Sequence, residues 1–70
     1  MRLEDIPVGA IVRVEGFDGE DAVIRKLEAM GLRKGKEVRI LQRVGRVILL
    51  RLGNSRLVLS RDVASKVRVA

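Results

Sequence analysis

Along most of the chain, apolar residues alternate with charged or polar ones, which is the period of a strand with one buried face. This alternation predicts five short strands, at 11–17, 37–43, 47–52, 56–60 and 66–69. A helical turn is expected at 60–65, before the last strand. Five strands joined by tight turns predict a mainly β fold that closes into a small barrel, because closure removes the exposed edges of a hydrophobic sheet.

Residues 18–35, between the first two strands, have the spacing of a helix instead. The apolar side chains of this stretch recur three or four positions apart and share one face: Val23, Ile24, Leu27 and Met30. We expect Asp18 to cap the first turn by accepting hydrogen bonds from its free amides. On the opposite face, Asp21 and Arg25 are expected to form an ion pair.

Glycines specify how this helix ends. Gly31 is expected to adopt the left-handed conformation that stops a helix, with Leu32 packing back on Leu27 in a Schellman motif. Gly35 lies in a basic turn that leads into the second strand. Neither glycine fits a phosphate-binding loop, because no strand leads into them and no Lys-Ser or Lys-Thr pair follows. We therefore interpret both as structural turns.

A third structural turn is expected at Gly53, which with Asn54 suits a two-residue hairpin connection between the third and fourth strands. In this register Arg51 lies opposite Arg56 on the outer face. The inner face is then wholly apolar, and it consists of Ile48, Leu50, Leu52, Leu57 and Leu59.

The same register leaves Val47, Leu49 and Val58 on the outer face, beside the arginines. Two interpretations are open. Either the N-terminal segment or the helix covers these side chains, or they form an exposed apolar row, which usually marks a contact site.

The chain has 70 residues and neither Cys nor His, which excludes disulfides, zinc fingers and iron–sulfur ligation. At this size a core is marginal, and oligomerisation could add to the burial, so a homo-oligomer stays open. Tyr and Thr are absent too, and the sequence offers no base near any of the three serines, Ser55, Ser60 and Ser65. Without the usual nucleophiles and general bases, we expect that the chain is not an enzyme.

Charge is distributed unevenly along the chain. Residues 1–32 carry four basic and seven acidic side chains, a net −3, and residues 33–70 carry eleven basic and two acidic ones, a net +9. A basic half suits nucleic acid, acidic lipid or an acidic protein surface, although Arg alternating with apolar residues is also typical of a solvated strand face. Phe17 is the only aromatic residue, which disfavours base stacking and proline-rich peptide grooves.

Asp18, Glu20 and Asp21 could together hold a hard cation, but helix capping explains them, and we assign no metal ligand. No apolar run approaches the roughly 20 residues that span a bilayer, and no signal peptide precedes the first strand. We expect a cytoplasmic protein with no direct membrane insertion.

Several segments, in this order and spacing, resemble the ferrous iron transport protein A (FeoA) family. They are Leu3 with Pro7-Val8-Gly9, residues 24–32 (IRKLEAMGL), residues 34–38 (KGKEV), the Gly53 hairpin, Leu57-Val58-Leu59, and the closing Ala64 with Val67-Arg68-Val69. The resemblance covers essentially the whole chain, 1–70, as a single domain. It implies an SH3-like barrel, a module that also occurs at the C-terminus of metal-dependent repressors.

The resemblance also implies a non-catalytic accessory protein of ferrous iron transport, which binds and regulates a membrane iron transporter with a GTPase domain. It further implies a weak association with a divalent metal ion such as ferrous iron. We expect the partner-binding surface to include five apolar residues: Leu27, Met30, Leu32, Leu49 and Val58. The alternative is a small basic barrel that binds nucleic acid, because residues 12–16 (VRVEG) followed by Gly19 are similar to a KOW motif.

Overall fold

A computed structural model describes the whole chain, residues 1–70. Its elements are the 3₁₀ helix η1 (Leu3–Asp5), β1 (Ile11–Phe17), α1 (Asp21–Ala29), β2 (Glu37–Val44), β3 (Val47–Leu52), β4 (Ser55–Ser60), α2 (Arg61–Ala64) and β5 (Val67–Val69). The bounds of β1 and β3 are those that the alternation predicts, and the other strands differ by one residue at one end. The predicted mainly β fold, with one helix between the first two strands, is confirmed.

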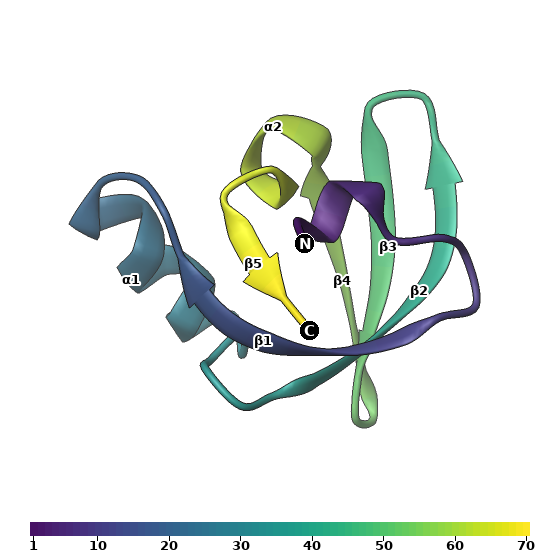
Figure 1. Cartoon of the computed structure of the whole chain (residues 1–70), viewed down its shortest axis with the longest axis horizontal. Helices are drawn as coiled ribbons and strands as arrows, with labels where there is room; N and C mark the ends of the chain where they lie inside the picture. Colours follow the sequence, from purple (N-terminus) through teal and green to yellow (C-terminus); the bar gives the residue numbers. More distant parts are fainter.

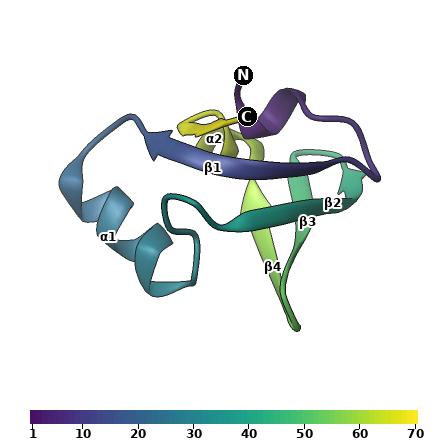
Figure 2. The same ribbon diagram turned by 60° about the horizontal axis from the view of Figure 1, so that its bottom comes forward.

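All five strands belong to one antiparallel sheet in the order β4-β3-β2-β1-β5. The long strand β1 pairs with both β2 and β5, and the sheet curves so that η1 and α2 lie together at one end of it (Figure 1). The helix α1 projects to one side, beyond the end of β1 (Figures 1 and 2). The two helices α1 and α2 therefore leave most of the outward side chains of β2, β3 and β4 exposed.

The core consists of fifteen buried side chains, all of them hydrophobic. Four of the five predicted inner residues of the hairpin are buried, and the fifth, Leu57, is half-buried against the core. Arg51 lies opposite Arg56, which confirms the two-residue turn at Gly53. Gly53 has a φ of +60° and Asn54 has no positive φ, as expected when glycine takes the first central position of a type II′ turn.

The start of α1 differs from the prediction. Asp18 does not cap the helix; Glu20 takes the cap position, and its side chain makes no capping hydrogen bond. The Asp18 carboxylate instead accepts a hydrogen bond from Arg2 and lies 3.6 Å from Nε of Arg68. Two guanidinium groups bind a carboxylate more strongly than exposed helix amides do, because both partners are charged.

The apolar face of α1 is only partly used by the core. Leu27 is buried, Val23 and Ile24 are half-buried, and Met30 is exposed. The expected ion pair with Asp21 is also absent, because Arg25 Nε donates instead to the backbone carbonyl of Asp21, at 3.4 Å.

The predicted end of α1 is confirmed in detail. The Leu32 amide donates to the Leu27 carbonyl and the Gly31 amide donates to the Glu28 carbonyl, both at 3.0 Å, which are the two bonds of a Schellman motif. Gly31 has a φ of +103° and Gly35 a φ of +89°, so both occupy backbone conformations that other residues rarely adopt.

Candidate interaction surface

The outer face of β3 and β4 carries Val47, Leu49 and Val58, which we call the apolar row. Leu49 and Val58 are direct cross-strand partners. Val58 is 60% exposed and Val47 is 43% exposed, while Leu49 is half-buried. Neither the N-terminal segment nor the helix covers them, so the structure decides for the exposed alternative. Val44, which is 61% exposed and pairs with Val47, extends the row onto β2 and was not predicted.

The N-terminal segment is held on the other side of the sheet by Arg43. A bulge in β2 between Ile40 and Gln42 places Arg43 opposite the buried Ile48, so its side chain points inward. There Arg43 donates to the carbonyls of Glu4 and Ile6, the latter at 2.7 Å. This tether explains why the segment before β1 cannot reach the apolar row.

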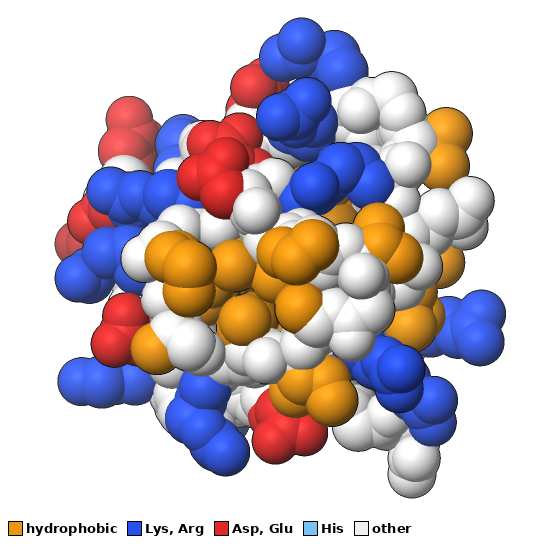
Figure 3. Space-filling view, turned by 45° about the vertical axis from the view of Figure 1, so that its right-hand side comes forward, with side chains coloured by type: hydrophobic (Ala, Val, Ile, Leu, Met, Phe, Trp, Pro, Cys, Tyr) orange, Lys and Arg blue, Asp and Glu red, His pale blue; other side chains and the backbone are white.

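On the face shown in Figure 3, hydrophobic side chains gather in a patch that is bordered by both basic and acidic side chains. The hollow beside the apolar row, lined by Gln42, Val44, Val47 and Leu49, has a volume of only about 40 Å³. Small-molecule sites usually enclose about 300–1,000 Å³. The apolar row is therefore a shallow surface, and the hollow beside it is too small for a small-molecule site.

Arg39, Arg51 and Arg56, which we call the arginine row, lie beside the apolar row on the same outer face. Arg39 is opposite Arg51, and Arg51 is opposite Arg56, so the three occupy neighbouring positions on β2, β3 and β4. All three are exposed, and none belongs to any of the four ion pairs of the molecule. Arg51 Nε donates to the Gly53 carbonyl at 3.0 Å.

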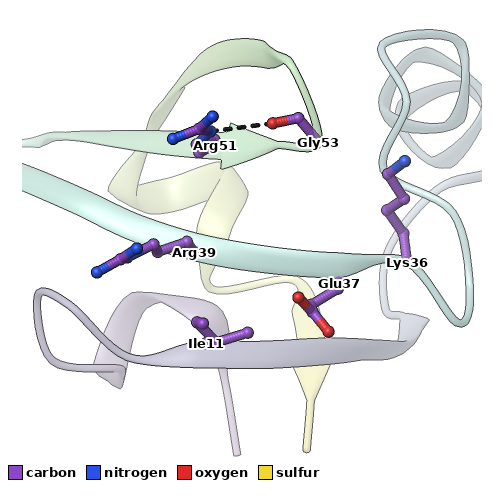
Figure 4. Close-up of a pocket in the computed structure, with 6 residues that line it drawn as sticks. All are labelled: Ile11, Lys36, Glu37, Arg39, Arg51 and Gly53. Atoms are coloured by element: carbon purple, nitrogen blue, oxygen red, sulfur yellow. Dashed lines mark hydrogen bonds between the residues drawn. The ribbon is translucent and has the colours of Figure 1, made fainter.

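An open hollow of about 320 Å³ adjoins the arginine row (Figure 4). It is lined by one hydrophobic residue, four charged residues and a glycine: Ile11, Lys36, Glu37, Arg39, Arg51 and Gly53. The one carboxylate among them, Glu37, lies 3.7 Å from the guanidinium of Arg13 on β1. The positive charge of Lys36 and the arginines is thus not balanced within the hollow.

The structure separates the five residues predicted to bind a partner. Leu27 and Leu32 are buried in the core, so we correct their assignment from contact residues to core residues. Met30 is exposed at the end of α1, the helix that projects on the other side of the molecule from the turn between β2 and β3 (Figure 1). Leu49 and Val58 lie together on the outer face. Helical spacing predicts that Leu27 and Met30 share one face of the helix. It does not predict how much of that face packs against the sheet, so it could not separate the buried residue from the exposed one.

The acidic side chains do not form a cluster that could hold a metal ion: no three of them come together, and the chain has no His or Cys. Asp18 is engaged by two arginines; the Arg2 hydrogen bond, together with the charges of Arg2 and Arg68, holds the pKa of Asp18 below its ordinary value of 3.8. Asp62 pairs with Arg46 at 3.2 Å. The donors present therefore do not fit a bound metal.

No helix of the chain has the length and apolar character needed to span a bilayer.

The chain is similar in sequence and in structure to several proteins of known structure. FeoA from Stenotrophomonas maltophilia is 30% identical, with a TM-score of 0.87 over 100% of this chain and 89% of that one. That protein is described as an SH3 domain protein complexed with zinc and as a candidate activating factor for bacterial ferrous iron transport. FeoA from Chlorobium tepidum is 27% identical, with a TM-score of 0.91 over 99% of this chain and 68% of that one.

A manganese-dependent transcriptional repressor has the same fold at 16% identity, with a TM-score of 0.88 over 96% of this chain and 39% of the repressor. No curated protein matches the chain. The model of the FeoA domain family matches residues 1–70. With its SH3-like barrel and this match over its whole length, the chain belongs to the FeoA domain family.

Proposed function

We propose that this chain is a non-catalytic, cytoplasmic accessory protein of ferrous iron transport, which binds a membrane iron transporter with a GTPase domain and regulates it. The observation that carries the proposal is the apolar row, an uncovered hydrophobic surface on a small domain. Membership of the FeoA family and the description of the Stenotrophomonas maltophilia protein as a candidate activating factor support the same role.

Two of the three hydroxyl groups of the chain have structural roles, which supports a non-catalytic function. Ser60 Oγ accepts a hydrogen bond from the Val63 amide at 3.2 Å, and Ser65 Oγ donates to the Asp62 carbonyl at 2.6 Å. Both serines are therefore used to cap the short helix α2. The binding of a partner requires none of these groups, whereas Val47 and Val58 of the apolar row are exposed and available for contact.

A binding assay with the isolated GTPase domain of the transporter tests the proposal. Burying a Val side chain completely is worth about 1.5–3 kcal/mol. Since Val58 is 60% exposed in the free chain, its burial in an interface would contribute about 1–2 kcal/mol. Val58→Asp removes this contribution and places a charge in the contact, so we expect the Kd to rise at least about tenfold.

Ala22→Asp is the matched control, because it places the same charge on an exposed position of α1. We expect it to change the Kd less than about twofold. Retention of full affinity by Val58→Asp, or an absence of binding by the unmodified chain under native conditions, would count against the proposal. If the apolar row instead joins two copies of the chain, sedimentation would show a dimer that Val58→Asp dissociates.

A further inference from the structure

The three side chains of the arginine row repel one another, and this repulsion lowers the stability of the sheet. Like charges directly opposite each other on neighbouring strands destabilise a sheet. Here this arrangement occurs twice in succession, between Arg39 and Arg51 and between Arg51 and Arg56. None of the carboxylates that pair with an arginine in this molecule pairs with a member of the arginine row. The row is therefore a concentration of positive charge that an external anion would relieve.

The chemistry around the row selects among anions. The adjoining hollow of about 320 Å³ adds Lys36 as a further cation but has only one hydrophobic lining residue, Ile11, unlike the mostly apolar sites that bind small molecules. No aromatic side chain lies in the hollow, so nucleic-acid bases have no surface on which to stack. Glu37 also faces the hollow and would repel any anion, so an anionic ligand is expected on the arginine row rather than beside Glu37.

The two rows fit a single segment. Along β3, Arg51 lies two residues from Leu49, and along β4, Arg56 lies two residues from Val58. Residues two apart on a strand are about 6.8 Å apart, and neighbouring strands are about 4.8 Å apart. Neighbouring side chains of one bound polypeptide can therefore contact the arginine row and the apolar row at the same time. Arginine also suits carboxylates, because its planar guanidinium can bind both oxygens.

From this arrangement we infer that the outer face of β2, β3 and β4 binds an acidic segment of a partner protein, with its carboxylates on the arginine row and its apolar residues on the apolar row. The inference rests on the proposed function for the identity of the partner, since the transporter would supply that segment. It specifies the chemistry by which the partner is recognised, and it predicts that the association weakens as the salt concentration rises.

A labelled synthetic peptide tests the inference without the transporter. Its sequence has a run of glutamates followed by leucines that alternate with serines, and its matched control has glutamine at each glutamate. Fluorescence anisotropy measures the affinity of each peptide for the chain. We expect the glutamate peptide to bind at least about tenfold more tightly than the glutamine peptide, and to lose several-fold in affinity between about 0.05 M and about 0.3 M salt.

Arg51→Glu distinguishes a binding role from a structural one. The new carboxylate would lie between Arg39 and Arg56, where opposite charges on neighbouring strands stabilise a sheet. We therefore expect the melting temperature to stay level or rise by a few degrees, while the affinity for the glutamate peptide falls at least about tenfold. Arg25→Glu, the same change of charge on α1, should alter that affinity less than about twofold.

Equal affinity of the two peptides would overturn the inference, and so would equal effects of the two arginine variants. Tighter binding of a single-stranded RNA with the same charge as the peptide would assign the face to nucleic acid instead. Because the peptide assay contains no transporter, the recognition of acidic segments can be confirmed even if the transporter does not bind. Conversely, transporter binding that Arg51→Glu leaves intact would retain the proposed function and reject this inference.

Discussion

Leu32→Ala tests the assignment of the α1 terminus, because Met30, two residues earlier, provides a matched control. Leu32 is completely buried, whereas Met30 is 46% exposed. Truncation of a buried leucine to alanine costs about 2–5 kcal/mol, since the lost transfer energy adds to the cost of a cavity. A domain of 70 residues has a free energy of unfolding of roughly 4–10 kcal/mol. Leu32→Ala should therefore remove a large fraction of the stability.

Thermal unfolding followed by circular dichroism measures the difference. For a domain of this size, 1 kcal/mol corresponds to about 4–8 °C, so we expect Leu32→Ala to lower the melting temperature by about 8–40 °C. Met30→Ala should lower it by less than about 8 °C, because a side chain that is half exposed loses less than about 1 kcal/mol. Equal losses in the two variants, or a larger loss for Met30→Ala, would refute the placement of Leu32 in the core.

Two further changes test the turn and the ion pair that flank α1. Gly31→Ala should cost about 1–2 kcal/mol in denaturant unfolding, because the φ of +103° is unfavourable for alanine although the nearest side-chain atom, Leu52 Cδ1, leaves room at 3.5 Å; unchanged stability would contradict this backbone conformation. Asp18→Asn should destabilise the fold near neutral pH, and the difference from the unmodified chain should persist above the ordinary pKa of 3.8 and disappear as the pH falls through the lowered pKa of the folded state. A difference between the two melting temperatures that is constant from neutral to strongly acidic pH would show that the carboxylate charge is not the cause.

Local rules in the sequence predict much of this fold because the relevant interactions are close in the chain. Alternation predicts β1 and β3 to the residue, since a strand with one buried face must alternate. Gly31 predicts the helix end because its conformation depends on its immediate neighbours. The opposition of Arg51 and Arg56 follows from a two-residue turn.

Interactions between distant segments account for what the sequence did not predict. Asp18 would cap the helix only if no stronger partner reached its carboxylate. Its two partners, Arg2 and Arg68, come from opposite ends of the chain, so a local capping rule could not predict them. Arg39 joins the arginine row through the pairing of β2 with β3, which includes a bulge that alternation does not predict. For the same reason, the sequence predicts the apolar row but not whether another segment covers it.

The most direct test of the proposed role is a nuclear magnetic resonance titration of the isotope-labelled chain with the cytoplasmic GTPase domain of the transporter. The account predicts that the amide resonances most affected belong to the outer face, at Leu49, Arg51 and Val58, and that those of the buried Leu27 shift little. A titration that affects none of the outer-face resonances, or affects mainly α1, would contradict it.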